Sequence, residues 1–166
     1  MSGPVRRIIV DGGSGAGKTT FARRLVERWG VLCGESVQLV SLDDCYPGWH
    51  GLAAASRMVV ADILRAHDPG YRRWDWERRE PADWVALDPG LPMVVEGCGA
   101  LTHDSARLAD LSFWLDMPAD ERRSRALARD GASYEPWWEV WAAQEAEHWR
   151  RHEPQRLACM VVIPPH

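Results

Sequence analysis

The stretch GGSGAGKT, residues 12 to 19, holds the residues best suited to bind phosphate. Its Gly12, four following residues, Gly17, Lys18 and Thr19 fit the phosphate-loop pattern G-x-x-x-x-G-K-[ST]. Glycine lets the backbone wrap a phosphate chain, and a helix that follows adds the positive end of its dipole. The plainer alternative is a glycine-rich connection into an ordinary helix. We expect a nucleotide site with ATP contacts at Gly12, Gly13, Ser14, Gly15, Ala16, Gly17, Lys18, Thr19 and Thr20.

Lys18 is the only lysine in the chain, since the other 19 of the 20 Lys and Arg residues are arginine. A lysine ammonium is a compact charge on a slim stem, whereas a guanidinium is planar and wider. Because every other residue of this kind is arginine, the lysine at position 18 indicates that this position has room only for the slimmer side chain. We therefore predict that Lys18 reaches the β- and γ-phosphates and acts in catalysis.

Carboxylates and a hydroxyl near the loop suggest a magnesium site. The Thr19 hydroxyl is placed to bind Mg²⁺ that bridges the phosphates, and such an ion usually takes only one or two carboxylates. Glu96 follows an apolar run and is the best candidate, although it could instead be a structural acid that binds the next loop. The predicted metal residues are Thr19, Glu96 and Asp43.

Apolar runs and helical patterns alternate along the chain, which predicts an α/β fold with a parallel sheet covered on both faces. We expect a three-layer αβα P-loop NTPase fold, strand order 2-3-1-4-5, in a single domain of residues 1–166 with a helical lid at about 119–135. An acid stands at or just beyond four strand ends, where such sheets bind ligands: Asp11, Asp43, Glu96 and Asp116. The expected strands are 5–10, 36–42, 91–97, 110–117 and 159–165, and the expected helices are 18–30 with Gly30 as C-cap, 52–66, 103–109, 119–129 and 136–151.

Composition excludes several classes of function. The net charge of −4 gives no reason to expect nucleic acid or an anionic membrane as partner. No apolar run is long enough to span a membrane, and the first residues lack the apolar region of a signal peptide. The four cysteines are far apart and form no CxxC, which suits a reducing cytoplasm.

Together with the phosphate loop, five further motifs give the chain a resemblance to uridine kinase and its nucleoside-kinase relatives. The resemblance implies that Asp43 accepts the proton of the substrate's 5′-hydroxyl, that Tyr46 lies in the substrate site and that Asp75 binds sugar hydroxyls. Trp74 could stack on a planar substrate ring or pack in the core. The motifs are LDDCY at 42–46, WDW at 74–76, VVEG at 94–97, ADERRSRALARD at 119–130 and VVIP at 161–164.

The resemblance also implies a lid helix whose arginines clamp the phosphates of ATP. Arg122, Arg125 and Arg129 stand at spacings of three and four, so they share one helix face, and their charge could neutralise the transferring phosphoryl group. We expect Arg122 to bind ATP and Arg125 and Arg129 to act in catalysis. A solvated, arginine-rich helix surface is the alternative.

The chain departs from the family at its acceptor region. Only residues 77–91 separate Trp76 from Pro92, which is too short for the family's long base-contacting hairpin, so we expect that hairpin to be absent. Ala126 stands where the family has a second arginine, and Cys45 where it has phenylalanine. We expect an ATP- and Mg²⁺-dependent kinase that phosphorylates a hydroxyl of a small molecule, possibly a nucleoside. The alternatives are a kinase for a sugar acid, antibiotic or other small alcohol, and an ATP-binding regulatory module. The oligomeric state stays open.

Overall fold

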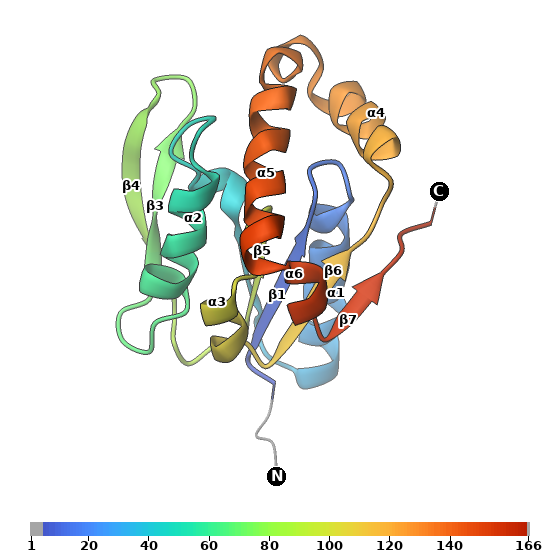
Figure 1. The fold of residues 1–166 in the computed structure, drawn as a ribbon. Coiled ribbons are helices and arrows are strands. Elements are labelled where there is room, and N and C mark those ends of the chain that lie inside the picture. The colour runs from blue at the N-terminus through green and yellow to red at the C-terminus, as the bar shows by residue number, and fades with distance from the viewer. Residues whose placement is uncertain (1–4, 166) are drawn as a thin grey trace.

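A computed structural model describes residues 5–165 of the chain and has an α/β fold (Figure 1). Five parallel strands form one sheet in the order β2-β5-β1-β6-β7, which reads 2-3-1-4-5 when only these strands are counted. The predicted α/β class and the five-stranded parallel sheet are confirmed. The sheet strands are β1 (Arg7–Gly12), β2 (Gln38–Ser41), β5 (Met93–Glu96), β6 (Leu111–Leu115) and β7 (Met160–Val162).

Helices cover both faces of the sheet because alternate strand residues point to opposite sides. Ile9 and Val95 pack with α2 and α5, whereas Ile8 and Val94 pack in a second core under α1. Figure 1 shows α5 in front of the sheet and α1 behind it. The helices are α1 (Lys18–Cys33), α2 (Leu52–Met58), α3 (His103–Leu108), α4 (Ala119–Asp130), α5 (Trp138–His152) and α6 (Pro154–Leu157).

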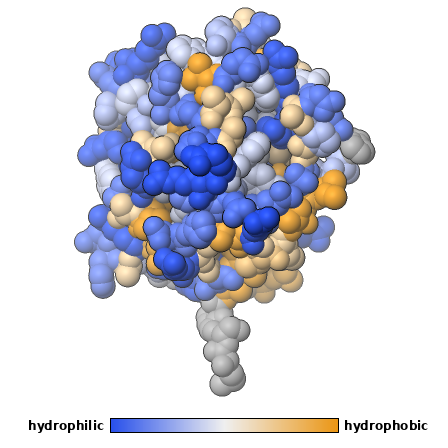
Figure 2. All heavy atoms as spheres, in the orientation of Figure 1, coloured by the Kyte–Doolittle hydropathy of each residue, from blue (hydrophilic) through white to orange (hydrophobic). Residues whose placement is uncertain are grey.

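Short helical turns extend two of these helices. The predicted helix over 52–66 is an α-helix only to Met58 and continues as a π-helical turn, η2 (Val59–Ile63). A 3₁₀ turn, Glu135–Trp137, leads from the lid into α5, and another, η1 (Leu42–Asp44), follows β2. The face shown in Figure 2 is largely hydrophilic, as expected where helices meet solvent.

A short β-hairpin stands beside the main sheet; it is not the family's long base-contacting hairpin, whose expected absence stays a prediction. Strands β3 (Gly70–Asp75) and β4 (Glu80–Ala86) pair antiparallel. The hairpin begins before the WDW motif and includes Trp74 and Asp75, which is why counting residues only after Trp76 missed it. It forms the left edge of the molecule in Figure 1.

The end of α1 is a correction to the sequence-based expectation. Gly30 was expected to cap this helix, but the helix continues to Cys33 and Gly34 is the cap. Gly34 has φ 67°, and its N–H donates to the Gly30 carbonyl at 3.0 Å. Glycine adopts this left-handed conformation without the steric cost that a side chain brings.

Gly34→Ala should therefore lower the free energy of unfolding by about 1 kcal/mol, because Ala disfavours left-handed backbone. Urea unfolding followed by circular dichroism measures the change. Gly30→Ala is the matched control: Gly30 lies inside the helix, and a new Cβ would meet only the Glu35 carbonyl oxygen at 3.3 Å. If Gly30→Ala destabilises the protein more than Gly34→Ala does, the helix ends earlier than the structure shows.

Candidate active site

The predicted phosphate loop connects β1 to α1, and its backbone is shaped by glycine. Gly15 and Gly17 have φ of 81° and 90°, values that favour glycine over other residues. A Cβ on Gly17 would meet no atom within 4 Å, whereas one on Gly15 would collide with the Arg122 carbonyl of α4. The loop is therefore open at Gly17, above the N-terminus of α1, and closed at Gly15 by the lid helix.

Lys18 lies inside this loop with only 8% of its surface exposed. Its Nζ donates to the Gly13 carbonyl at 2.9 Å, so the ammonium curls back over the loop. Burial alone would lower the pKa of Lys18, but the acidic groups of Cys98, Glu96 and Glu145 outweigh that effect and raise it. Lys18 is therefore a buried cation at neutral pH.

Thr19, Glu96 and Ser41 meet beside the ammonium. The Thr19 hydroxyl donates to Glu96 Oε1 at 3.0 Å, and the Ser41 hydroxyl donates to the same oxygen at 2.6 Å. Burial raises the pKa of Glu96, while Lys18 and the bond from Ser41 oppose the rise. A hydroxyl and a carboxylate at this separation are hard oxygen donors that fit Mg²⁺ with its remaining water ligands. Sequence reasoning missed Ser41, although it ends β2 next to the candidate acid Asp43.

Asp43 and Asp44 lie in η1, and both are exposed. Asp43 adds to the raised pKa of Lys18 and of Glu96, behind the larger causes, so its charge acts on the phosphate-loop site. Asp44 adds to the raised pKa of Tyr71 on β3, which burial chiefly raises. Of the two adjacent acids, Asp43 is therefore the one whose charge acts on Lys18 and Glu96.

The other two strand-end acids have different surroundings. Asp11 is fully buried inside β1 and accepts three backbone N–H groups: Gly12 at 2.6 Å, Leu101 at 2.8 Å and Gly99 at 3.1 Å. It therefore ties the start of the phosphate loop to the loop after β5. Asp116 is exposed and lines a small pocket beside the loop.

Ser14, at the tip of the phosphate loop, has all three of its polar groups bound by distant side chains. Glu145 of α5 accepts its N–H at 2.6 Å, Arg122 donates to its carbonyl at 3.3 Å, and Tyr134 donates to its hydroxyl at 2.8 Å. Arg122 also lies 3.4 Å from Glu145, whose side chain is buried. Sequence reasoning listed Ser14 as an ATP contact and missed Tyr134 and Glu145, since no local pattern marks contacts over more than 100 residues.

The three predicted clamp arginines do not converge in this structure. Arg122 is buried against the phosphate loop, and its guanidinium also lies 5.3 Å from the Trp149 ring. Arg125 donates to the Pro165 carbonyl at 3.3 Å near the end of the chain. Arg129 pairs with Asp130 at 2.7 Å; this bond raises its pKa, and Asp43 contributes to the rise. Arg129 is thus the exposed arginine on the side of Asp43.

The predicted acceptor residues serve the scaffold in this structure. Tyr46 is 2% exposed, and its hydroxyl donates to the Cys98 carbonyl at 2.8 Å. Asp75 accepts the N–H groups of Glu77 and Arg78 at the hairpin turn, at 3.0 and 2.9 Å. Trp74 is half-buried, and its Nε1 finds no partner among residues 5–165.

An aromatic cluster centred on Trp49 connects the hairpin with the end of the lid. The ring of Trp49 lies 5.1 Å from Trp76 of the hairpin turn and stacks on Tyr134 at 5.3 Å and on Trp137 at 5.6 Å. Trp76 also donates its Nε1 hydrogen to the Asp43 carbonyl at 2.9 Å. The short β3–β4 hairpin therefore contacts the backbone of the candidate base.

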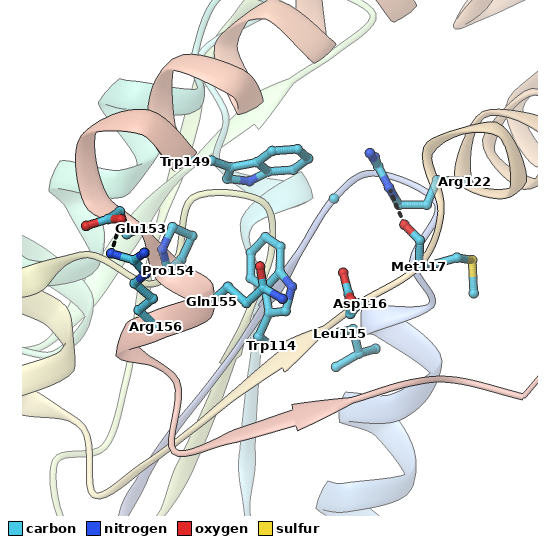
Figure 3. Close-up of a pocket in the computed structure, with 11 residues that line it drawn as sticks. Trp114, Leu115, Asp116, Met117, Arg122, Trp149, Glu153, Pro154, Gln155 and Arg156 are labelled. Atoms are coloured by element: carbon cyan, nitrogen blue, oxygen red, sulfur yellow. Dashed lines mark hydrogen bonds and ion pairs between the residues drawn. The ribbon is translucent and has the colours of Figure 1, made fainter.

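A pocket of about 290 Å³ lies on the other side of the loop, toward β6 (Figure 3). Figure 3 shows the rings of Trp149 and Trp114 on two sides of the space and Arg122 on the side of the phosphate loop. The two rings meet edge to face at 5.7 Å, and Gln155 of α6 closes the outer end. The pocket therefore pairs flat aromatic walls with a cation next to the loop.

Known proteins share this fold. The solved structure of a protein described as a possible uridine kinase from Bacillus stearothermophilus superposes with a TM-score of 0.65 and 18% identity, over 97% of this chain and 90% of that one. The shikimate kinase of Acinetobacter baumannii, in complex with shikimate, superposes with a TM-score of 0.57 and 14% identity, over 98% of this chain and 85% of that one. No helix in residues 5–165 is long and apolar enough to cross a membrane.

Sequence comparison is more specific. The uridine kinase of Halobacterium salinarum is 30% identical in an alignment of 149 residues that covers 78% of this chain and 64% of the relative. The uridine kinase of Deinococcus deserti is 30% identical in an alignment of 153 residues that covers 78% of this chain and 72% of that protein. A family model described as an AAA domain matches residues 8–150. The chain therefore belongs to this AAA domain family and is also a relative of the uridine kinases.

Proposed function

We propose that this chain is a kinase that transfers the γ-phosphoryl group of ATP to a hydroxyl of a small molecule. The observation that carries the proposal is the group around Lys18: a buried ammonium in a phosphate loop, beside the Thr19–Glu96 pair, with Asp43 among the charges that raise its pKa. A module that only holds ATP needs the loop but not a carboxylate on the acceptor side. Asp43 therefore favours a kinase over a regulatory module.

The strand order suggests how the two substrates lie. Asp43 and Glu96 follow β2 and β5 on one side of β1, and the pocket with Trp114 and Trp149 lies toward β6 on the other. A phosphate chain held at the end of β1 would therefore direct the nucleotide base into this pocket and the γ-phosphate toward Asp43. The aromatic rings offer the base flat apolar surfaces.

In the proposed reaction the acceptor oxygen attacks the γ-phosphorus, the bond from that phosphorus to the bridging oxygen of ADP breaks, and Asp43 takes the hydroxyl proton. Lys18 and the loop N–H groups hold the phosphate oxygens. Thr19 and Glu96 would hold Mg²⁺, which supplies positive charge to the phosphates when bound. Asp43 contributes to the raised pKa of Arg129, behind Asp130, so we assign to Arg129 the role of neutralising charge on the transferred group.

For the acceptor we propose a nucleoside first, because the relatives named above are uridine kinases. Another small alcohol is the alternative, and a panel of nucleosides and small alcohols incubated with ATP and Mg²⁺ distinguishes them by the phosphorylated product. The four free cysteines support the further proposal of a reducing, cytoplasmic location.

Lys18→Ala should lower kcat/KM by about 10²–10³-fold, the usual effect of removing one donor to a developing charge. Circular dichroism and the melting temperature check that the fold is intact. Lys18→Arg should not restore turnover, because the buried position leaves little room for a planar guanidinium. Wild-type turnover in the arginine variant would show that charge alone, and not shape, is required.

Glu96→Gln keeps the size of the side chain and its acceptor oxygen for Thr19 and Ser41 but removes the charge. If Glu96 organises Mg²⁺, the concentration of Mg²⁺ at half-maximal activity should rise about tenfold. The melting temperature should change little, since burial disfavours the charged form of Glu96 and Glu145 remains as an opposite charge for the buried Lys18. Glu35→Gln, at an exposed ion pair, is the control. An unchanged Mg²⁺ requirement, or a collapse of stability, would favour a structural role for Glu96.

Asp43→Asn and Asp44→Asn form a matched pair of adjacent, exposed acids. Asp43→Asn should lower turnover by about 10²–10⁴-fold, the range for a general base, while ATP binding measured by calorimetry persists. Asp44→Asn should keep most of the activity, because Asp43, and not Asp44, is among the charges that raise the pKa of Lys18. Loss of activity in the Asp44 variant alone would move the base by one residue, and full activity in both would exclude a carboxylate base in this loop.

A further inference from the structure

A second and larger cavity, of about 680 Å³, lies between α2 and α5, apart from the phosphate loop. We call it the α2–α5 pocket; its walls include Leu52, Val60 and Ala143, and Thr102 and His148 also line it. Its size is that of a small-molecule site. Neither the phosphate-loop residues nor Asp43 nor Glu96 line it, so the proposed kinase reaction leaves the pocket without a role.

The charged groups around the α2–α5 pocket leave it positive. Its two acids are both paired with arginines that do not line it: Asp104 with Arg107 at 3.0 Å, and Glu147 with Arg150 at 2.7 Å. Its own two arginines, Arg57 and Arg151, form no ion pair or hydrogen bond with any residue in 5–165. Two guanidinium groups without an ion pair or hydrogen bond in residues 5–165, over an apolar wall, are suited to an anion that also has an apolar body.

A buried polar atom at the pocket also lacks a partner. Nδ1 of His152 is buried but makes no hydrogen bond within the described part of the chain. The ring of His148 lies 4.8 Å from His152; burial and His148 both lower the pKa of His152, so its ring is neutral at pH 7 and can donate or accept.

The pocket is connected to the phosphate loop through His148. Nε2 of His148 lies 3.1 Å from the Leu101 carbonyl and 3.7 Å from Asp11 Oδ2. Asp11 in turn accepts the N–H of Gly12, the first residue of the loop. A molecule that contacts His148 would therefore be connected to the phosphate loop through the side chains of His148 and Asp11.

From these observations we propose that the α2–α5 pocket binds a small organic anion, a carboxylate or phosphate ester with an apolar body, at a site separate from those of ATP and the acceptor. Arg57 from α2 and Arg151 from α5 bind the anionic group, and the apolar wall contacts the body of the ligand. This proposal does not require the kinase reaction.

Isothermal titration calorimetry without ATP tests it, with phenyl phosphate and benzoate as probes. Benzyl alcohol is the uncharged probe, and inorganic phosphate is the anion without an apolar body. Both aromatic anions should bind the wild-type protein at least tenfold more tightly than either control probe, since hydrogen bonds to charged groups are the strong ones. If neither aromatic anion binds measurably, the proposal is overturned. It is also overturned if benzyl alcohol binds with the same affinity as the anions. A difference between phenyl phosphate and benzoate identifies the preferred anionic group.

Arg57→Gln/Arg151→Gln should weaken binding of both anions by at least tenfold. Arg23→Gln/Arg28→Gln is the matched control, because it removes the same charge from exposed positions on α1, across the sheet. Ala143→Trp should block the pocket without changing charge, with the melting temperature as a check on folding. Unchanged affinity in the Arg57/Arg151 variant or in Ala143→Trp would place the anions elsewhere. Kinase turnover is measured separately, so failure here leaves the proposed function untouched.

Discussion

A buried positive charge next to the phosphate loop is the constraint on which the rest of the site depends. The ammonium of Lys18 is almost removed from water, and an ion in that position is costly unless opposite charges surround it. Glu96 and Glu145 supply those charges from β5 and α5, two elements on either side of the loop. The same constraint explains why both acids are themselves nearly inaccessible, at 1% exposure each. The loop, the end of β5 and the middle of α5 therefore form one electrostatic unit.

Helix α5 supports this unit with two residues one turn apart. Glu145 accepts the N–H at the tip of the loop, and His148 lies against Asp11, which accepts the N–H at its start. Residues three apart on a helix lie on the same face. One face of α5 therefore holds Ser14 directly and Gly12 through Asp11. The conformation of the phosphate loop therefore depends on the position of α5. The same helix also forms a wall of the α2–α5 pocket.

Much of the fold and the centre of the site could be predicted from the sequence because their signals are local. The apolar runs placed the five sheet strands, and the glycines with Lys18 and Thr19 placed the phosphate loop. Ser41, Tyr134 and Glu145 could not be found this way, because their importance comes from contacts with residues 55, 120 and 131 positions away. Gly34 was missed because Gly30, four residues earlier, gives the same local signal for a helix end.

The hairpin was missed for a different physical reason, and that reason bears on the acceptor. Its turn contains no glycine or asparagine: Arg79, with φ 57°, takes the left-handed position, and Pro81 stands inside β4. Contacts outside the hairpin must therefore hold it, and the structure shows them in Trp76, whose ring packs at a tilt against Trp49 and whose Nε1 donates to the Asp43 carbonyl. The side of the site that receives the acceptor is consequently shaped by stacked rings from the hairpin, the Trp49 segment and the lid. Such rings offer broad apolar surface and few hydrogen-bond groups, so the acceptor's hydroxyl must be oriented chiefly by Asp43, and its remaining body by ring contacts.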